Sequence, residues 1–214
     1  MITIVDYGLG NIASVKNAFK QIGYTSQVTS SYSDIKAAKI LVVPGQGACG
    51  QAMSQLHSYG LISPILEHIS NNRPYLGICL GFQLLFETSE EDGGVKTLGV
   101  FKGNVKKFTL SKEKIPHMGW NRLIISKNNH HLFQNITEPD VYFVHSYCVE
   151  NADKSVISTT TLYGIPFVSS VAKGAIFGTQ FHPEKSGEVG LRILKNFLKS
   201  VDVFTELSLD GEKS

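Results

Sequence analysis

The chain has 214 residues, of which 42% are hydrophobic and 18% are charged, and its formal net charge is +2. This composition is typical of a soluble globular protein, and so small a charge gives no reason to expect nucleic acid or a membrane as a partner. The three cysteines are too few for a disulfide framework, and no apolar run approaches the ~20 residues that span a bilayer. We expect a single domain in the cytoplasm.

The first half of the chain alternates short strands with amphipathic helices. The apolar pattern predicts strands over 2–5, 24–29 and 39–43, and helices over about 12–22, 48–56 and 61–70. Asn11 is placed to cap the first helix, and Gly23 to end it. Continuous apolar strands that alternate with helices predict a parallel sheet covered on both faces.

The next element centres on a cysteine between two glycines, within Tyr-Leu-Gly-Ile-Cys-Leu-Gly-Phe-Gln-Leu-Leu-Phe over 75–86. This pattern predicts a strand, a tight turn at Cys79 and a helix. A nucleophile on such an elbow has a strained backbone, and only small neighbours let strand and helix pack closely. The helix start would favour the thiolate, which is the reactive form. The alternative is a small buried cysteine in an ordinary turn.

After Gly93-Gly94 the strands follow one another without long helices between them. The pattern predicts mainly antiparallel strands and hairpins over 100–101, 105–108, 121–125, 141–144, 156–158 and 166–171, and another strand over 175–181. A final helix is predicted over about 188–199. The expected fold is therefore α/β, with a mostly parallel central sheet flanked by helices and a hairpin-rich second half. One domain would span 1–200, followed by a loose polar tail over 201–214.

A cysteine nucleophile needs a base, and the base needs an orienting group. His182 has suitable surroundings, because it ends a predicted strand and Glu184 follows two residues later. Side chains at i and i+2 of extended backbone point the same way, and Pro183 would hold that geometry. We predict that Glu184 fixes the tautomer of His182 and stabilises its imidazolium. A strand-terminal histidine beside a surface acid is the alternative.

The oxyanion of an acyl transfer needs N–H donors aimed at it. Leu80, directly after the nucleophile, supplies one by analogy with other elbows. A second could come from the glycine-rich turn Pro44-Gly45-Gln46-Gly47, which could equally be an ordinary connection between a strand and a helix.

Two other patterns favour binding sites only weakly. The segment 8–13 fits the dinucleotide fingerprint G-x-G-x-x-G/A, but Asp6 puts a negative charge before the turn and the next strand lacks the acid expected for a ribose hydroxyl. We interpret this segment as a tight turn. The seven histidines show no His-x-x-x-His or Cys/His spacing, so neither a metal nor a cofactor is expected.

With cysteine, histidine and glutamate in this order, the chain resembles the class I (triad) glutamine amidotransferases. The segments 77–83 and 181–184 match the two signatures of that family. Further segments look like those of the glutaminase subunits of imidazole glycerol phosphate synthase, namely 6–11, 116–121, 142–147 and 182–187. The resemblance runs from residue 1 to about residue 200.

The resemblance implies that Cys79 attacks the side-chain amide of L-glutamine, giving a glutamyl thioester and ammonia, while His182 moves protons. Water then releases glutamate. In the family, the ammonia passes to a (β/α)8 cyclase subunit in a heterodimer, which makes imidazole glycerol phosphate and a purine precursor in histidine biosynthesis. By matching position, glutamine would be held by Gly47, Gln83, Glu91, Ser146 and Tyr147. The partner side would carry Asn11, Trp120, Tyr142 and Lys185.

This sequence departs from the family's usual pattern at Gln46, where valine is usual, and at Ala48-Cys49, where Ala-Phe is usual. The resting position of the loop, and hence the glutaminase activity without a partner, therefore stays open. Three alternatives also stay open. They are a paralogous ammonia supplier to a barrel partner that aminates a different sugar, as in surface-polysaccharide synthesis; a stand-alone cysteine hydrolase or peptidase; and a nucleotide-binding protein.

Overall fold

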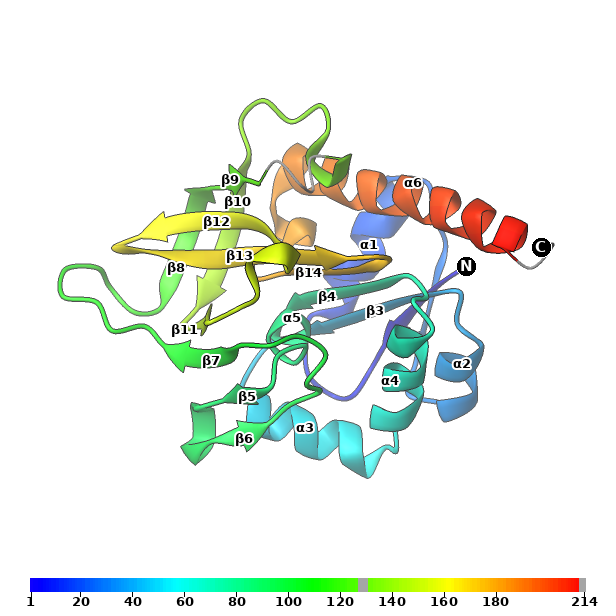
Figure 1. Cartoon of the computed structure of the whole chain (residues 1–214), viewed down its shortest axis with the longest axis horizontal. Coiled ribbons are helices and arrows are strands. Elements are labelled where there is room, and N and C mark those ends of the chain that lie inside the picture. The colour runs from blue at the N-terminus through cyan, green and yellow to red at the C-terminus, as the bar shows by residue number, and fades with distance from the viewer. Residues whose placement is uncertain (127–130, 212–214) are drawn as a thin grey trace.

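The described residues of the computed structural model, 1–126 and 131–211, form an α/β architecture around a twelve-stranded mixed sheet (Figure 1). Its parallel half has the strand order β2-β1-β3-β4-β14. These strands are β2 (Ser26–Thr29), β1 (Ile2–Val5), β3 (Ile40–Gly45), β4 (Tyr75–Cys79) and β14 (Ile176–Thr179). Each pairs in parallel with its neighbour, which confirms the predicted parallel sheet.

Helices cover both faces of this parallel half, as expected for buried parallel strands (Figure 1). One face carries α1 (Ile12–Gln21) and α6 (Gly187–Gly211), whose Phe19 and Phe197 are buried in one hydrophobic cluster. The other face carries α2 (Tyr32–Ala37), α3 (Cys49–Ser58), α4 (Ile62–Ser70) and the single turn α5 (Leu80–Gln83). Leu56 and Ile65 are buried there in a second cluster.

Local sequence explains where these helices begin. Asn11 caps α1 as predicted, because its side-chain oxygen accepts the N–H of Ser14 at 3.1 Å. Ser31 caps α2 in the same way through the N–H of Asp34. The sequence pattern did not predict α2, because its six residues bury only Ile35 and are too few to show an amphipathic stripe.

The second half is mainly antiparallel, as predicted. Its strands are β5 (Thr88–Ser89), β6 (Val95–Lys96), β7 (Asn104–Lys107), β8 (His117–Arg122), β9 (Ile124–Ile125), β10 (Asp140–His145), β11 (Tyr147–Glu150), β12 (Ile157–Tyr163) and β13 (Ile165–Lys173). β8 and β10 pair with each other in a separate two-stranded sheet. β5 and β7 are an exception to the antiparallel arrangement, because they pair in parallel.

Two predictions for this half are wrong. Residues 100–101 form a bend rather than a strand; the N–H of Phe101 bonds the carbonyl of Leu85, and its ring packs near that of Phe86. The apolar side chains of this segment are therefore explained by core packing and not by strand pairing.

The last helix does not end near 199 but continues to Gly211, and no glycine or proline interrupts the chain between Gly190 and Gly211. Residues 212–214 lie outside the described residues. Within the described chain, no helix is long and apolar enough to cross a membrane.

The strand–turn–helix at β4 and α5 depends on two glycines, as predicted. A Cβ on Gly77 would lie 2.5 Å from the carbonyl oxygen of Gly81. A Cβ on Gly81 would collide with the carbonyl oxygen of Val43 on the neighbouring strand β3. Side chains are therefore excluded at both positions by backbone atoms, which cannot rotate away.

We expect Gly81→Ala to lower the free energy of unfolding by about 3 kcal/mol, at the upper end of overpacking costs, because α5 must move away from β3. The measurement is urea unfolding followed by circular dichroism. Gly50→Ala is the matched control: it is also helical, and its Cβ would meet only side-chain atoms of Asp92, the nearest at 3.1 Å. An equal stability for the two variants would contradict the close-packing explanation.

Candidate active site

Cys79 lies where β4 ends and α5 begins, with backbone angles φ 54° and ψ −100°. A positive φ is strained for a residue other than glycine, and such strain concentrates at functional sites. The residue is 7% exposed and lines a cavity. This geometry supports the predicted nucleophile elbow.

His182 and Glu184 are brought together as predicted, but by a different backbone. His182 Nδ1 lies 2.8 Å from Glu184 Oε1, and both side chains are almost completely buried. The connection is a 3₁₀ turn over Pro183–Lys185, not the extended strand that we expected. Pro183 starts this turn, where its missing N–H and fixed φ are compatible with helical backbone.

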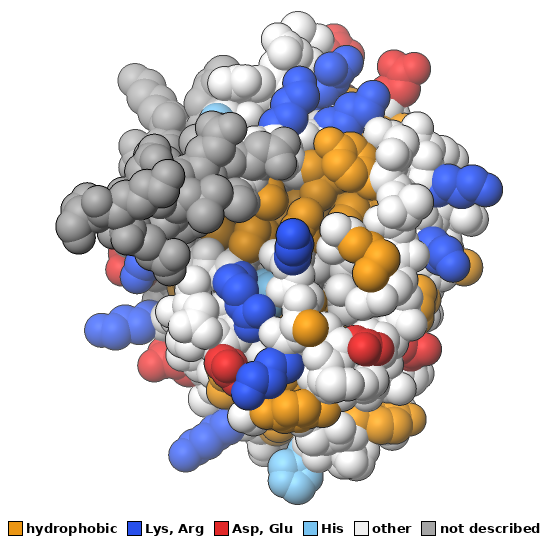
Figure 2. Space-filling model, turned by 90° about the vertical axis from the view of Figure 1, so that its right-hand side faces the viewer, with side chains coloured by type: hydrophobic (Ala, Val, Ile, Leu, Met, Phe, Trp, Pro, Cys, Tyr) orange, Lys and Arg blue, Asp and Glu red, His pale blue; other side chains and the backbone are white. Residues whose placement is uncertain are grey.

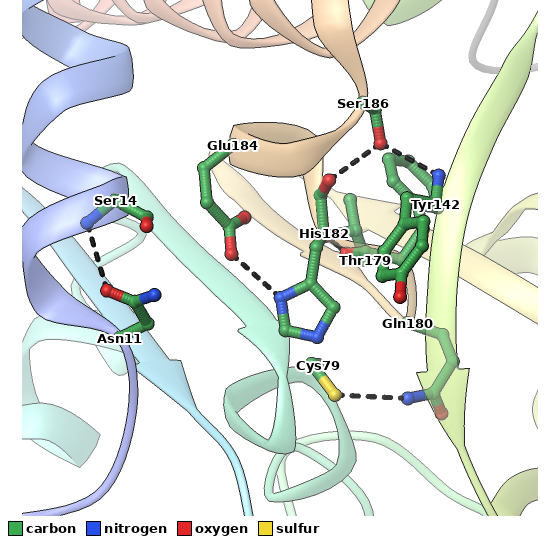
Figure 3. A network of polar contacts seen from close by, with 10 residues as sticks. Asn11, Ser14, Cys79, Tyr142, Thr179, Gln180, His182, Glu184 and Ser186 are labelled. Atoms are coloured by element: carbon green, nitrogen blue, oxygen red, sulfur yellow. Dashed lines mark hydrogen bonds and ion pairs between the residues drawn. The ribbon is translucent and has the colours of Figure 1, made fainter. Parts of the chain in front are cut away.

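The imidazole of His182 lies between Glu184 and Cys79 (Figure 3). Its Nδ1 meets the carboxylate, while Nε2 is buried and makes no hydrogen bond to a described residue. Burial opposes the imidazolium, but the nearby charges of Cys79 and Glu184, together with the bond to Glu184, outweigh it and raise the pKa of His182 to about 10. The three side chains thus form a charged unit that stabilises the protonated base.

A cavity of about 440 Å³ opens beside Cys79. It is lined by most of the residues predicted to bind glutamine or its oxyanion, together with both reacting side chains: Gln46, Gly47, Cys79, Leu80, Gln83, Glu91, Ser146, Tyr147 and His182. Sequence analysis missed four further lining residues, Ala48, Pro116, Val144 and His145. The cavity collects segments that lie far apart in sequence, which is why local patterns could not find all of its wall.

Strand register explains how the glycine-rich loop reaches the nucleophile. Gly45 of β3 lies directly opposite Cys79 of β4, so the chain that leaves β3 enters the cavity at Gln46 and Gly47. Gly47 has φ 102°, a conformation that glycine adopts readily. Leu80 is the first residue of α5, and the N–H groups of a first helical turn have no partner within their own helix. Both predicted oxyanion donors therefore border the nucleophile.

Glu91 reaches the same cavity from a 3₁₀ turn over Glu91–Gly93. Its Oε2 accepts the backbone N–H of Cys49 at 2.8 Å, at the start of α3. Burial raises the pKa of Glu91, an effect that the bond from Cys49 opposes and the nearby Asp92 adds to. An acidic side chain held in this way offers an acceptor for a cationic group.

Gln83 is held by protein groups on both sides of its amide. Its Nε2 donates to the carbonyl of Tyr147 at 3.3 Å and to Gln180 Oε1 at 3.0 Å, and its Oε1 accepts from Cys49 Sγ at 3.7 Å. Gln180 in turn donates from Nε2 to Cys79 Sγ at 3.7 Å. Sequence analysis missed Gln180, although it stands two residues before His182, the same spacing that drew attention to Glu184.

His145 borders the cavity and forms a buried pair with His117. His145 Nδ1 must donate to the carbonyl of Tyr147, which can only accept, at 2.7 Å. Its Nε2 then accepts from His117 Nδ1 at 3.0 Å, and His117 Nε2 accepts from Asn121 at 3.3 Å. Burial lowers the pKa of His117 to about 4 and that of His145 to about 3. Both are therefore satisfied, neutral core histidines.

The residues predicted to face a partner surround the triad from the outside. Asn11 and Tyr142 lie on opposite sides of His182 and Glu184 (Figure 3). The N–H of His182 bonds the carbonyl of Tyr142 at 2.9 Å, and the ring of Tyr142 meets that of Trp120 edge to face at 6.2 Å. Trp120 is 60% exposed. Lys185 follows Glu184 directly in the 3₁₀ turn.

The turn at 8–13 lacks a free backbone donor that dinucleotide binding would require. The N–H of Gly8, which a pyrophosphate would need, donates instead to Asp6 Oδ1 at 3.0 Å. This bond agrees with the interpretation of the segment 8–13 as a tight turn.

The comparisons with known proteins agree with this geometry. The family described as Glutamine amidotransferase class-I matches residues 3–201. The imidazole glycerol phosphate synthase subunit HisH of Caldanaerobacter subterraneus is 48% identical over 198 residues, which cover 92% of this chain and 97% of that protein. The chloroplastic imidazole glycerol phosphate synthase hisHF of Arabidopsis thaliana is 42% identical over 217 residues, but this chain spans only 36% of that longer protein.

A solved structure described as a glutamine amidotransferase has the same fold, with a TM-score of 0.75 at 17% identity over 94% of this chain and 100% of that one. The likeness in fold, the family match over nearly the whole chain and the high identity to HisH subunits all point the same way. The chain belongs to the class-I glutamine amidotransferase family, in the group of imidazole glycerol phosphate synthase HisH subunits.

Proposed function

We propose that this protein hydrolyses L-glutamine at Cys79 and supplies the ammonia to a cyclase subunit of imidazole glycerol phosphate synthase. The observation that carries the proposal is the unit formed by Cys79, His182 and Glu184 at the wall of a cavity large enough for an amino acid. The description of the matching family supplies glutamine as the substrate, and the names of the HisH relatives supply the synthase.

In the first step, the Cys79 thiolate attacks the carboxamide carbon of glutamine. The new C–S bond pushes an electron pair onto the amide oxygen, which the N–H of Leu80 and an N–H of the loop at Gln46 and Gly47 stabilise. The imidazolium of His182 then gives its proton to the amide nitrogen, the C–N bond breaks, and ammonia leaves. A glutamyl thioester on Cys79 remains.

In the second step, His182 acts as the base. It takes a proton from a water molecule that attacks the thioester carbonyl, and the C–S bond breaks to release glutamate and restore the thiolate. Glu184 holds Nδ1 of His182 throughout, which keeps Nε2 directed at the reacting atoms.

The far end of glutamine needs groups for a carboxylate and an ammonium. Glu91 supplies an acceptor for the ammonium, and Ser146 and Tyr147 also line the cavity, at the join between β10 and β11. Gln83 acts mainly by positioning, because its amide is already bonded to Tyr147 and Gln180.

A cyclase partner fits the exposed apolar side of β8. Met118 is 62% exposed and Trp120 60%, although large apolar side chains are usually buried. The ring of Tyr142 contacts that of Trp120, and its backbone is hydrogen-bonded to His182 and Ser186. A partner bound at Trp120 would therefore be linked to the base through Tyr142. The Arabidopsis relative named hisHF extends well beyond the matched region, which supports a second unit in the assembly.

The function is tested by glutamate release from glutamine, with and without a histidine-pathway cyclase subunit loaded with an acceptor analogue. We expect strong stimulation by the loaded partner, and at least about a thousandfold loss in Cys79→Ala, because the nucleophile is removed. High activity without any partner would favour a stand-alone hydrolase. Silence with this cyclase, but stimulation by a sugar-aminating barrel partner, would favour the paralogous supplier.

The charge on His182 should depend on Cys79. The pKa of His182, about 10, lies above the ordinary 6.5. The imidazolium therefore contributes fully to the stability of the fold below pH 6.5, and this contribution is lost as pH rises toward 10. In Cys79→Ala the interactions with the sulfur disappear while burial remains, and we expect the pKa of His182 to fall. NMR titration of the imidazole measures this. Cys148→Ala, which removes a buried cysteine outside the cavity, is the control. An unchanged titration in Cys79→Ala would contradict the charged unit.

The partner surface is tested by binding. We expect Trp120→Ala to raise the dissociation constant for the cyclase about thirtyfold, as for an aromatic hot spot, because a large apolar contact is lost. Tyr59→Ala removes another half-exposed aromatic, at the end of α3, and should leave binding unchanged. Isothermal titration calorimetry compares the two. Equal affinities for both variants would place the interface elsewhere.

A further inference from the structure

A line of buried side chains reaches the sulfur of Cys79 from a direction different from that of His182 (Figure 3). Gln180 Nε2 lies 3.7 Å from Cys79 Sγ, and Gln180 Oε1 lies 3.0 Å from Gln83 Nε2. Gln83 Oε1 lies 3.7 Å from Cys49 Sγ. Nothing in the mechanism above uses Gln180 or Cys49.

The direction of these hydrogen bonds follows from their partners. The backbone carbonyl of Tyr147 can only accept, so the amide group of Gln83 that faces it must be the NH₂. That NH₂ also faces Gln180, which must therefore present its oxygen. The other end of the Gln180 amide, which faces Cys79, is then the NH₂ donor. The sulfur of Cys79 is the acceptor in this bond.

Burial makes this arrangement rigid. Gln180 and Cys49 are 0% exposed and Gln83 is 5% exposed, so water does not compete for their polar groups. The backbone N–H of Gln180 is also bonded to the carbonyl of Ser169 at 2.9 Å. A donor that is aimed in advance at an anion costs little to organise, and bonds to charged groups are stronger than neutral ones.

The imidazolium of His182 already supports the thiolate of Cys79, while the helix start that was also expected to support it contributes little. The helix that follows Cys79, α5, is a single turn of four residues, so few peptide dipoles are aligned toward the sulfur. Burial itself disfavours the thiolate. We propose that Gln180 is a further catalytic residue, which stabilises the thiolate of Cys79 through its side-chain N–H, and that Gln83 and Cys49 position it.

This proposal gives Gln180 a part in both halves of the proposed reaction. Before attack it raises the fraction of Cys79 present as the nucleophilic thiolate. When the thioester is hydrolysed, it stabilises the same thiolate as the leaving group. Cys49 ends the line of hydrogen bonds, because its thiol donates to the amide oxygen of Gln83.

The test is the pH dependence of alkylation of Cys79 by iodoacetamide in the full chain, with the modified peptide identified by mass spectrometry. We expect Gln180→Leu to raise the midpoint of the profile by about one to two pH units, equal to a tenfold to hundredfold loss of thiolate. Gln180→Glu keeps the oxygen that accepts from Gln83 and replaces only the donor. It should raise the midpoint further, because it adds a negative charge beside the sulfur.

The matched control is Asn196→Leu, which removes a buried amide bonded to the carbonyls of Leu132 and Gln134 on the α6 side. It should lower the melting temperature without moving the alkylation profile. If both Gln180 variants melt at lower temperature but show the same alkylation midpoint as the protein without a substitution, the proposal is overturned. Since alkylation needs neither glutamine nor a partner, its outcome is independent of whether the proposed glutaminase function holds.

Discussion

The close approach of α5 to β3 is the constraint on which the rest of the site depends. Gly81 lies against the carbonyl of Val43 so tightly that no side chain fits between them. This contact lets the chain turn directly from β4 into α5 and holds Cys79 at a positive φ of 54°. The same approach places the end of β3, with the loop at Gln46 and Gly47, beside the nucleophile. Strain at one residue is thus stabilised by packing across two strands.

The same sheet positions the base, His182. β14 pairs in parallel with β4, so both strands end at the same edge, where ligands bind in open α/β sheets. Gln180 and His182 follow the end of β14 and approach Cys79 from different sides. Tyr142 fixes the backbone of His182 from the separate β8–β10 sheet, which also carries the exposed Trp120. The nucleophile, its base and the exposed apolar side of β8 are therefore linked through a few neighbouring residues.

Sequence predicted the elements with local signals and missed those decided by tertiary contacts. The elbow, the cap at Asn11 and the His182–Glu184 pair each carry their signal within a few residues. The bend at 100–101 looked like a strand because its apolar residues are buried for packing, not for pairing. Gln180 was missed because a glutamine at the end of a strand shows no sign of its partners 97 and 101 residues away. Gln83 was assigned to substrate, yet its amide is bonded within the protein.

The central claim is that Cys79, among three buried cysteines, forms the covalent intermediate. Acid quenching of the complex during turnover of glutamine, followed by peptide mass spectrometry, tests it most directly. The account predicts a glutamyl adduct on the peptide that contains Cys79, and none on the peptides that contain Cys49 or Cys148. An adduct on either of those, or turnover without any adduct while hydrolysis of the thioester is rate-limiting, would contradict it.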